Sequence, residues 1–273
     1  MKHKPIEIFA RIASFVLRLM APPKCAICGT LIDDSGELCH ECLEYFAHAM
    51  NRRCPVCSKT ARSCVCRPRN MFDTTSLGEK KLLALTYFAK NDCTDPGDIA
   101  SRRLVYAVKK SPARSCVRFA ARQISQELLK FFAKEKLDIT SWCITYPPRS
   151  PKEARRFGFD QSKQLASLIA EYTGMKCISC FGRKCGKMQK NLTAAERKLN
   201  ADEAYFLFSE ESITDRKFII VDDVVTTGST VNACALLLKN SGATDIFPVC
   251  ISRTKKKKRK PKRNSRGKLW FRR

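Results

Sequence analysis

The stretch FIIVDDVVTTGST, residues Phe218 to Thr230, carries the most informative pattern in this chain. Its first four residues are apolar and mostly β-branched, which is typical of a strand buried on both faces. Two adjacent carboxylates, Asp222 and Asp223, follow this run. A hydroxyl-rich loop with one glycine then leads into a helix expected over Val231–Asn240. This order of strand, acidic pair, loop and helix predicts a phosphate-binding loop, because the backbone N–H groups and the dipole at a helix start favour an anion.

The stretch carries neither the Gly-Lys-Ser/Thr ending of nucleoside triphosphatases nor a GxGxxG dinucleotide fingerprint. An ordinary strand-turn-helix connection capped by Ser229 or Thr230 is the simpler alternative. A cap explains one hydroxyl, whereas the acidic pair followed by five loop residues needs a further reason. The arrangement resembles the phosphoribosyl pyrophosphate (PRPP) motif of type I phosphoribosyltransferases. That resemblance implies that both acids hold the ribose hydroxyls, that Mg²⁺ accompanies PRPP, and that the loop wraps the 5′-phosphate with Thr226, Thr227, Gly228, Ser229 and Thr230.

Eight of the sixteen cysteines fall between residues 25 and 66, in four closely spaced pairs. Pairs of thiolates at this spacing reach one tetrahedral ion, and two pairs complete a structural zinc site. We therefore expect a double zinc ribbon with two Zn²⁺ ions. Sequence proximity assigns the first four and the last four ligands to separate ions, with interleaved pairing as the alternative. The expected ligands are Cys25, Cys28, Cys39, Cys42, Cys54, Cys57, Cys64 and Cys66.

Composition and charge limit the classes of protein that fit. The 273 residues suit one medium domain and a smaller one, and 44% hydrophobic residues are enough for a core. The formal charge is +26, and about half of the excess lies in the basic stretch 253–273. Such a surplus favours nucleic acid or an anionic membrane surface as a partner, and a solvated tail is the alternative.

The first twenty residues look like a secretion signal, but Glu7, Arg11 and Arg18 interrupt the apolar run. The run is also too short to cross a bilayer, so we expect no transmembrane segment. The charges share one helical face, which predicts an amphipathic helix that packs on the protein or docks on a membrane surface. We therefore expect a cytoplasmic protein, either free or peripheral to the inner face of the membrane, with reduced cysteines.

Short apolar runs alternate with helical periodicity after residue 82, which predicts an α/β fold with a parallel sheet. The expected strands are Leu83–Phe88, Trp142–Tyr146, Lys217–Val221 and Thr244–Cys250, and the expected helices include Arg102–Lys110, Ala113–Lys134 and Phe159–Tyr172. The expected domains are an amphipathic helix at 1–21, a double zinc ribbon at 22–68, a phosphoribosyltransferase-like domain at 75–252 and a disordered basic tail at 253–273.

Two further motifs complete the pattern. YPPRSPKEARRFGFDQ ends at Gln161, and QKNLTAAERKLN begins at Gln189. With the cysteine pairs before them and the acidic motif after them, they resemble the ComF family of competence proteins over about residues 5–252. One departure is Asp160, where the family commonly has Asn, and we expect this acid to cap the helix that follows. Another is the length of the basic tail, so the resemblance implies nothing about the tail.

The resemblance implies a cytoplasmic role in natural transformation, in which the protein handles incoming single-stranded DNA beside uptake-machinery proteins such as a helicase. The alternative is a catalytically active phosphoribosyltransferase of nucleotide metabolism whose acceptor base is unknown. A regulator that senses PRPP is a weaker third hypothesis. For the pyrophosphate and acceptor side of the site, the candidates are Arg149, Arg155, Arg156, Gln161, Gln189 and Arg197. Cys177, Cys180 and Cys185 are interpreted as structural thiols.

Overall fold

A computed structural model describes residues 22–32, 36–71, 75, 77, 79–89, 94–110, 114–184, 204–208 and 213–255. Within these residues, five parallel strands form a sheet in the order β1-β7-β6-β2-β3. In that order the strands are Leu83–Phe88, Asp245–Thr254, Lys217–Val225, Trp142–Thr145 and Lys176–Cys177. A separate antiparallel pair joins β4 (Phe181–Arg183) to β5 (Tyr205–Leu207). The parallel α/β fold expected from the sequence is confirmed.

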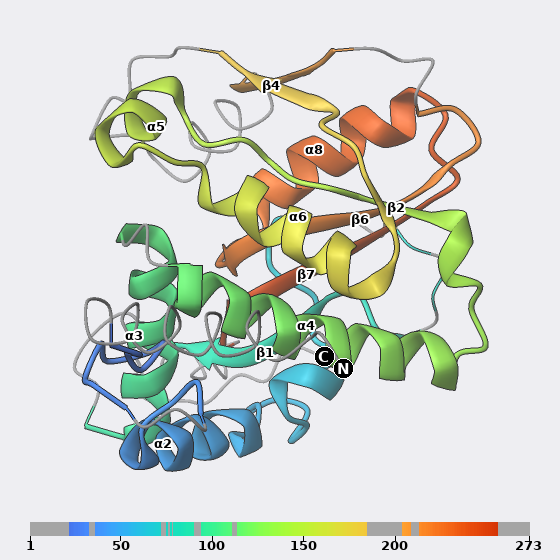
Figure 1. Ribbon diagram of the computed structural model, residues 1–273. Helices are drawn as coiled ribbons and strands as arrows, with labels where there is room; N and C mark the ends of the chain where they lie inside the picture. Colours follow the sequence, from blue (N-terminus) through green and yellow to red (C-terminus); the bar gives the residue numbers. More distant parts are fainter. Residues whose placement is uncertain are drawn as a thin grey trace, which may run out of the picture.

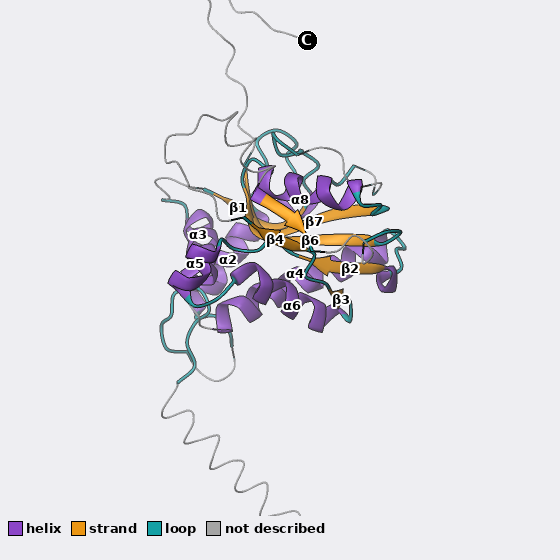
Figure 2. Cartoon of the chain, turned by 90° about the horizontal axis from the view of Figure 1, so that it is seen from above, coloured by secondary structure: helices purple, strands orange, loops and turns teal. Residues whose placement is uncertain are grey.

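Helices cover both faces of the sheet (Figures 1 and 2). Helix α8 (Ser229–Asn240) lies on one face, whereas α4 (Arg114–Lys134) and α6 (Gln161–Thr173) lie on the other. Helix α3 (Pro96–Lys110) packs against β1 and α4, and α2 (His40–Asn51) packs against α3. The described residues also contain two 3-10 turns, Ala61–Ser63 and Ile139–Ser141.

The segment before α6 forms a short helix that the sequence analysis did not predict. Residues Pro151–Phe157 form the short helix α5, so Arg155 and Arg156 lie on a helix. Its start follows from the sequence, because the Ser150 side chain accepts a hydrogen bond from the Glu153 N–H and proline occupies the first turn. Asp160 caps α6 as expected, since its carboxylate accepts hydrogen bonds from the N–H groups of Ser162 and Lys163.

Other boundaries also differ from the expected ones. Strand β1 has the predicted bounds, but α3 begins at Pro96 and not at Arg102. The Asp95 side chain accepts a hydrogen bond from the Asp98 N–H and so starts this helix earlier. Strand β6 continues through the acidic pair to Val225, and β7 continues to Thr254. Arg253 therefore lies in the sheet and not in the basic tail.

The cysteine-rich region folds as two similar turns. In each, the first cysteine N–H donates to a carbonyl five residues later, at 2.8 Å for Cys25 to Thr30 and for Cys54 to Lys59. The carbonyl of the same cysteine accepts a hydrogen bond from the N–H four residues later, which belongs to Gly29 or Ser58, at 2.9 Å. Both of these residues have positive φ, 78° and 57°, which the tight turn requires.

This region packs against both faces of β1, which is an edge strand of the sheet. Cys25, Ile27 and Cys42 belong to the apolar core that contains α4 and α6. Cys54, Ala61 and Cys64 belong instead to the core on the α8 face. This core also contains Phe218, Ile220 and Val231. The hydroxyl of Tyr87 in β1 donates to the Lys59 carbonyl at 3.0 Å. The cysteine-rich region is thus built into both cores.

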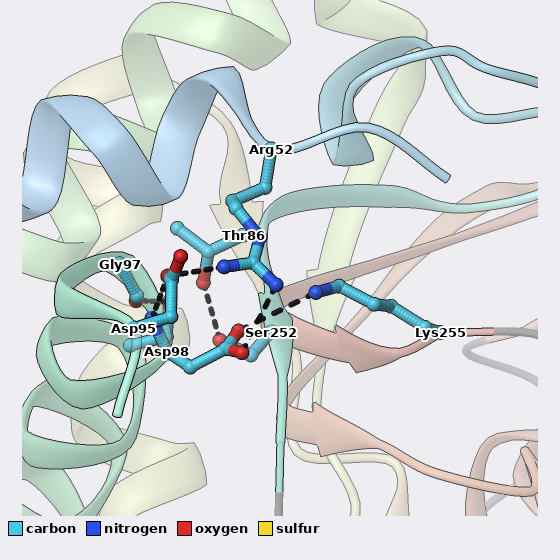
Figure 3. A network of polar contacts seen from close by, with 8 residues as sticks. Arg52, Thr86, Asp95, Gly97, Asp98, Ser252 and Lys255 are labelled. Carbon is cyan, nitrogen blue, oxygen red and sulfur yellow. Dashed lines mark hydrogen bonds and ion pairs between the residues drawn. The ribbon is translucent and has the colours of Figure 1, made fainter. Parts of the chain in front are cut away.

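A polar network holds α2 against the rest of the molecule (Figure 3). Arg52, just after α2, forms ion pairs with Asp95 and, at 3.1 Å, with Asp98 at the start of α3. Lys255 approaches the other oxygen of Asp98 at 3.5 Å, and the neighbouring hydroxyls of Thr86 and Ser252 lie 2.5 Å apart. The network therefore joins α2, the start of α3 and the end of β7.

Candidate functional site

Eight cysteines gather into two groups of four, and these are the groups expected from sequence proximity. Within each group, the sulfur atoms lie within 4.8 Å of one another. Sulfur separations of 3.6 Å for Cys28–Cys39 and Cys57–Cys64 and 3.9 Å for Cys54–Cys66 fit a tetrahedral ion, since Zn–S bonds of about 2.3 Å place ligands about 3.8 Å apart. Four thiolates leave no open coordination position, so both groups fit structural zinc.

The acidic pair lies near the carboxyl end of β6. The side chain of Asp223 is buried and contacts two groups. It forms an ion pair with the Lys109 ammonium at 3.4 Å, from the last turn of α3, and accepts a hydrogen bond from the Gln161 amide at 3.3 Å, from the first turn of α6. The two helices thus fix the Asp223 carboxylate from one side. The Oε1 atom of Gln161 is buried and has no hydrogen-bond partner among the described residues.

Asp222 has a different environment. Burial and then the neighbouring negative charge of Asp223 raise the pKa of the Asp222 carboxyl to about 7, although the Asp223 N–H and Lys109 act in the opposite direction. That N–H donates to the Asp222 carboxylate at 2.8 Å. A carboxyl with this pKa changes its charge near neutral pH. Groups that donate hydrogen bonds or carry positive charge bind its ionised form.

The hydroxyl-rich loop follows at the start of α8. Gly228 has φ of +86°, a left-handed conformation that favours glycine, and it is the residue before the helix. The hydroxyls of Thr227 and Ser229 lie 3.0 Å apart. Thr226 and Thr227 are exposed, and Ser229 and Thr230 are half-buried. Hydroxyl groups and the N-terminal end of α8 are therefore next to the acidic strand, as a phosphate-binding loop requires.

The arginines of the second motif lie as follows. The Arg149 guanidinium donates to the carbonyls of Lys109 at 2.8 Å and Phe159 at 3.2 Å, and it stacks on the ring of Phe157. It therefore joins the end of α3 to the loop before α6. Arg155 and Arg156 are exposed on α5. Contact of these three arginines with pyrophosphate or an acceptor stays a prediction.

Several expectations concern residues outside the described part of the chain. These are the amphipathic helix at 1–21, the motif with Gln189 and Arg197, Cys185, and the tail from residue 256. Cys177 and Cys180 are described, and burial raises the pKa of both thiols. They fall in neither group of four cysteines.

Sequence reasoning missed two residues. Lys109 contacts Asp223, and Asn70 contacts the hydroxyl-rich loop through its side chain, 2.9 Å from the Ser229 hydroxyl. Lys109 is one of two lysines in the last turn of α3, where lysine is common for helix stability alone. Asn70 follows the last cysteine pair without any motif. Both contacts join segments far apart in the sequence, and no local sequence pattern predicts them.

An open groove of about 820 Å³ lies between the first cysteine turn and α3. Arg102, Arg103 and Tyr106 of α3 line it, and Glu41 is its acidic residue. Tyr106 is 42% exposed, and the Lys110 ammonium lies 5.2 Å from the centre of its ring. An exposed aromatic ring among cations is a combination that binds single-stranded nucleic acid.

Comparison with known families agrees with this geometry. The phosphoribosyl transferase domain family matches residues 111–269, and the double zinc ribbon domain family matches residues 16–69. The chain therefore belongs to the phosphoribosyl transferase domain family and carries a double zinc ribbon ahead of that domain.

Its relatives confirm the resemblance to ComF proteins. Competence protein ComFC of Streptococcus pneumoniae is 24% identical over 82% of this chain and 96% of its own length. DNA utilization protein YhgH of Salmonella typhimurium is 33% identical, over 55% of this chain and 66% of the relative, just under two thirds of its length. Competence protein F of Haemophilus influenzae is 29% identical over 33% of this chain and 41% of its own length.

Solved structures give a weaker comparison. The match to a hypoxanthine phosphoribosyltransferase from Staphylococcus aureus covers 50% of this chain and 64% of the enzyme's chain, with a TM-score of 0.33 and 12% identity. The fold assignment rests on the strand order and the family match. In the described part of the chain, no helix combines the length and apolar character that a bilayer span needs.

Proposed function

We propose that the site formed by Asp222 and Asp223, near the carboxyl end of β6, binds PRPP with Mg²⁺. The observation that carries this proposal is the position of the acidic pair beside the loop at the start of α8. Carboxylates accept hydrogen bonds from ribose hydroxyls, whereas the loop offers hydroxyls and helix N–H groups to a phosphate. One ligand with a ribose and a 5′-phosphate satisfies both chemistries.

The chain's own residues fit such a ligand. Lys109 and Gln161 hold Asp223 on its protein side, so the carboxylate is oriented before a ligand arrives. The unpartnered Gln161 Oε1 is an acceptor suited to a sugar hydroxyl. Mg²⁺, when bound with PRPP, would neutralise charge on the pyrophosphate oxygens, and the carboxylates of Asp222 and Asp223 are oxygen ligands of the kind it prefers.

The biological role we propose is the handling of single-stranded DNA during DNA uptake, in the cytoplasm. The names of the relatives, competence protein and DNA utilization protein, support this role. The groove with Arg102, Arg103 and Tyr106 supports it independently, because it combines positive charge with an exposed ring. The basic composition of the chain also supports binding to DNA. We propose uptake-machinery proteins as its protein partners.

Calorimetric titration of the zinc-loaded protein with PRPP and Mg²⁺ tests the ligand. We expect binding in the wild-type protein and its loss in an Asp222→Asn/Asp223→Asn variant that keeps its zinc and thermal stability. Equal binding by the variant would refute the assignment of the acidic pair. Assay of pyrophosphate release with a panel of bases then separates binding from turnover, since a phosphoribosyltransferase releases pyrophosphate only with its acceptor.

Fluorescence titration with a labelled oligothymidylate at several salt concentrations tests the groove. The Arg102→Ala/Arg103→Ala variant should bind more weakly, and the slope of log K against log salt should fall by about one to two, because each phosphate contact contributes about 0.7 for single strands. Lys239→Ala, exposed on α8 on the opposite face, should change neither value. An unchanged slope in the arginine variant would exclude the groove as the contact surface.

A further inference from the structure

The segment that leaves the second cysteine group lies directly on the hydroxyl-rich loop. The Asn70 N–H donates to the Thr227 carbonyl at 2.8 Å, and its side-chain amide donates to the Ser229 hydroxyl oxygen at 2.9 Å. Pro68 and Met71 are buried, and a Cβ atom added at Gly228 would lie 3.1 Å from the Cβ atom of each. The loop is therefore held from outside the phosphoribosyl transferase domain.

The Asn70 contact determines which way the Ser229 hydroxyl can donate. Because the amide N–H occupies a lone pair of the Ser229 oxygen, the hydroxyl proton must point to another acceptor. Thr227, whose hydroxyl lies 3.0 Å away, is one such acceptor. A phosphate oxygen bound in the loop would be a stronger one, since hydrogen bonds to a charged group are about twice as strong as neutral ones. Asn70 thus prepares Ser229 as a donor to an anion.

The position of Asn70 depends in turn on the second zinc group. Cys66, a ligand in that group, lies four residues before Asn70, and its carbonyl accepts a hydrogen bond from the buried Arg253 of β7. The adjacent Thr254 hydroxyl donates to the Thr226 carbonyl at 2.9 Å. Zinc ligands, the end of β7 and the loop therefore form one connected unit.

We propose that the ribbon segment Cys66–Met71 is part of the phosphate-binding site and that Asn70 is a positioning residue for it, acting through Ser229. Zinc held by the second cysteine group would then order the phosphate loop as well as the ribbon. This inference rests on the proposed function, because it assigns a further residue to the same 5′-phosphate site.

Titration with ribose 5-phosphate tests Asn70, since this probe carries the 5′-phosphate without pyrophosphate or Mg²⁺. Loss of one hydrogen bond should weaken binding by about five- to tenfold in Asn70→Ala, because such a bond contributes about 1 kcal/mol. Asn70→Asp should bind more weakly still, since its carboxylate would attract the Ser229 proton and repel the phosphate. Asn240→Ala, the same change at an exposed position at the end of α8, should match the wild type.

Two further readouts separate positioning from loss of the fold. Zinc analysis should give two ions per chain in every variant, and hydrogen exchange of the 226–230 amides should be faster in Asn70→Ala without ligand. Unchanged affinity in Asn70→Ala would overturn the role of Asn70 and leave the proposed ligand intact. No binding by the wild-type protein would refute the phosphate site itself, and with it this inference, even if loop exchange still responded to Asn70.

Discussion

Gly97 sets how closely α2 of the zinc ribbon packs on α3, and its replacement by alanine tests that contact. A Cβ atom at this position would lie 2.9 Å from the Ala49 nitrogen, 3.0 Å from the Ala49 Cα and 3.1 Å from the His48 carbonyl carbon. All three are backbone atoms of α2, so no flexible side chain can move aside. The helices must separate by a few tenths of an ångström, and the ion pairs of Arg52 across the same contact must lengthen.

The expected magnitude follows from two opposing effects. Overpacking of a close contact costs about 1–3 kcal/mol, whereas alanine is favoured over glycine in a helix by up to about 1 kcal/mol. We therefore expect Gly97→Ala to lower the free energy of unfolding by about 1–2 kcal/mol, which for a chain of this length lowers Tm by about 2–4 °C.

Thermal unfolding of the zinc-loaded protein, followed by circular dichroism, measures this change. Gly36→Ala is the matched control, because a Cβ atom there would meet its nearest neighbour, the Leu38 carbonyl oxygen, at 3.4 Å. That variant should unfold within about 1 °C of the wild type. If Gly97→Ala were as stable as Gly36→Ala, the close packing of α2 on α3 would be wrong.

Three other perturbations have defined outcomes. Arg52→Ala leaves Asp98 with Lys255 as its remaining cation and should destabilise the protein by about 1–3 kcal/mol, measured by urea unfolding. The raised pKa of Asp222 predicts that PRPP–Mg²⁺ binding strengthens as pH rises from 6 to 8, because the ionised carboxylate binds the ligand. In Lys109→Met this rise should shift to higher pH, since removing a nearby cation raises that pKa further, as a calorimetric pH series would show. Cys57→Ser should reduce zinc from two ions per chain toward one, measured by elemental analysis.

Each of these changes has a control on the same molecule. Arg118→Ala removes an exposed arginine of α4 and should leave urea unfolding unchanged. Lys110→Met removes the lysine next to Lys109, which faces Tyr106, and should keep the wild-type pH profile. Cys177→Ser changes a cysteine outside both groups and should retain two zinc ions. A shift in any control equal to that of its partner would contradict the corresponding assignment.

Local sequence was sufficient for the elements whose cause is local. The run Leu83–Phe88 forms the strand it predicts, because five apolar residues and one β-branched threonine suit a position between two cores. The cysteine spacing predicted both metal groups for the same reason. The start of α3 was missed because Asp95-Pro96-Gly97-Asp98 has the composition of a turn, whereas here Asp95 caps the helix and proline occupies its first position.

Contacts between distant segments could not be predicted. Lys109 and Gln161 meet at Asp223 only because α3 and α6 end on the same side of the sheet. The role of Arg149 illustrates the same limit, since its charge suggested a phosphate contact and its guanidinium donates to two backbone carbonyls. A residue type indicates which chemistry is available, and the packing of helices decides where it is used.

The packing of the zinc ribbon on β1 also helps the protein to avoid aggregation. Strand β1 is an edge strand with the sequence LALTYF, which carries no charge and no proline. Such a segment, when uncovered, is a template for pairing with another chain. The ribbon covers it on both sides, through Tyr87 to the second cysteine turn and through the core around the first. A newly made chain that has not yet acquired zinc would therefore expose an uncharged edge strand, and zinc supply would limit the yield of soluble protein as well as its stability.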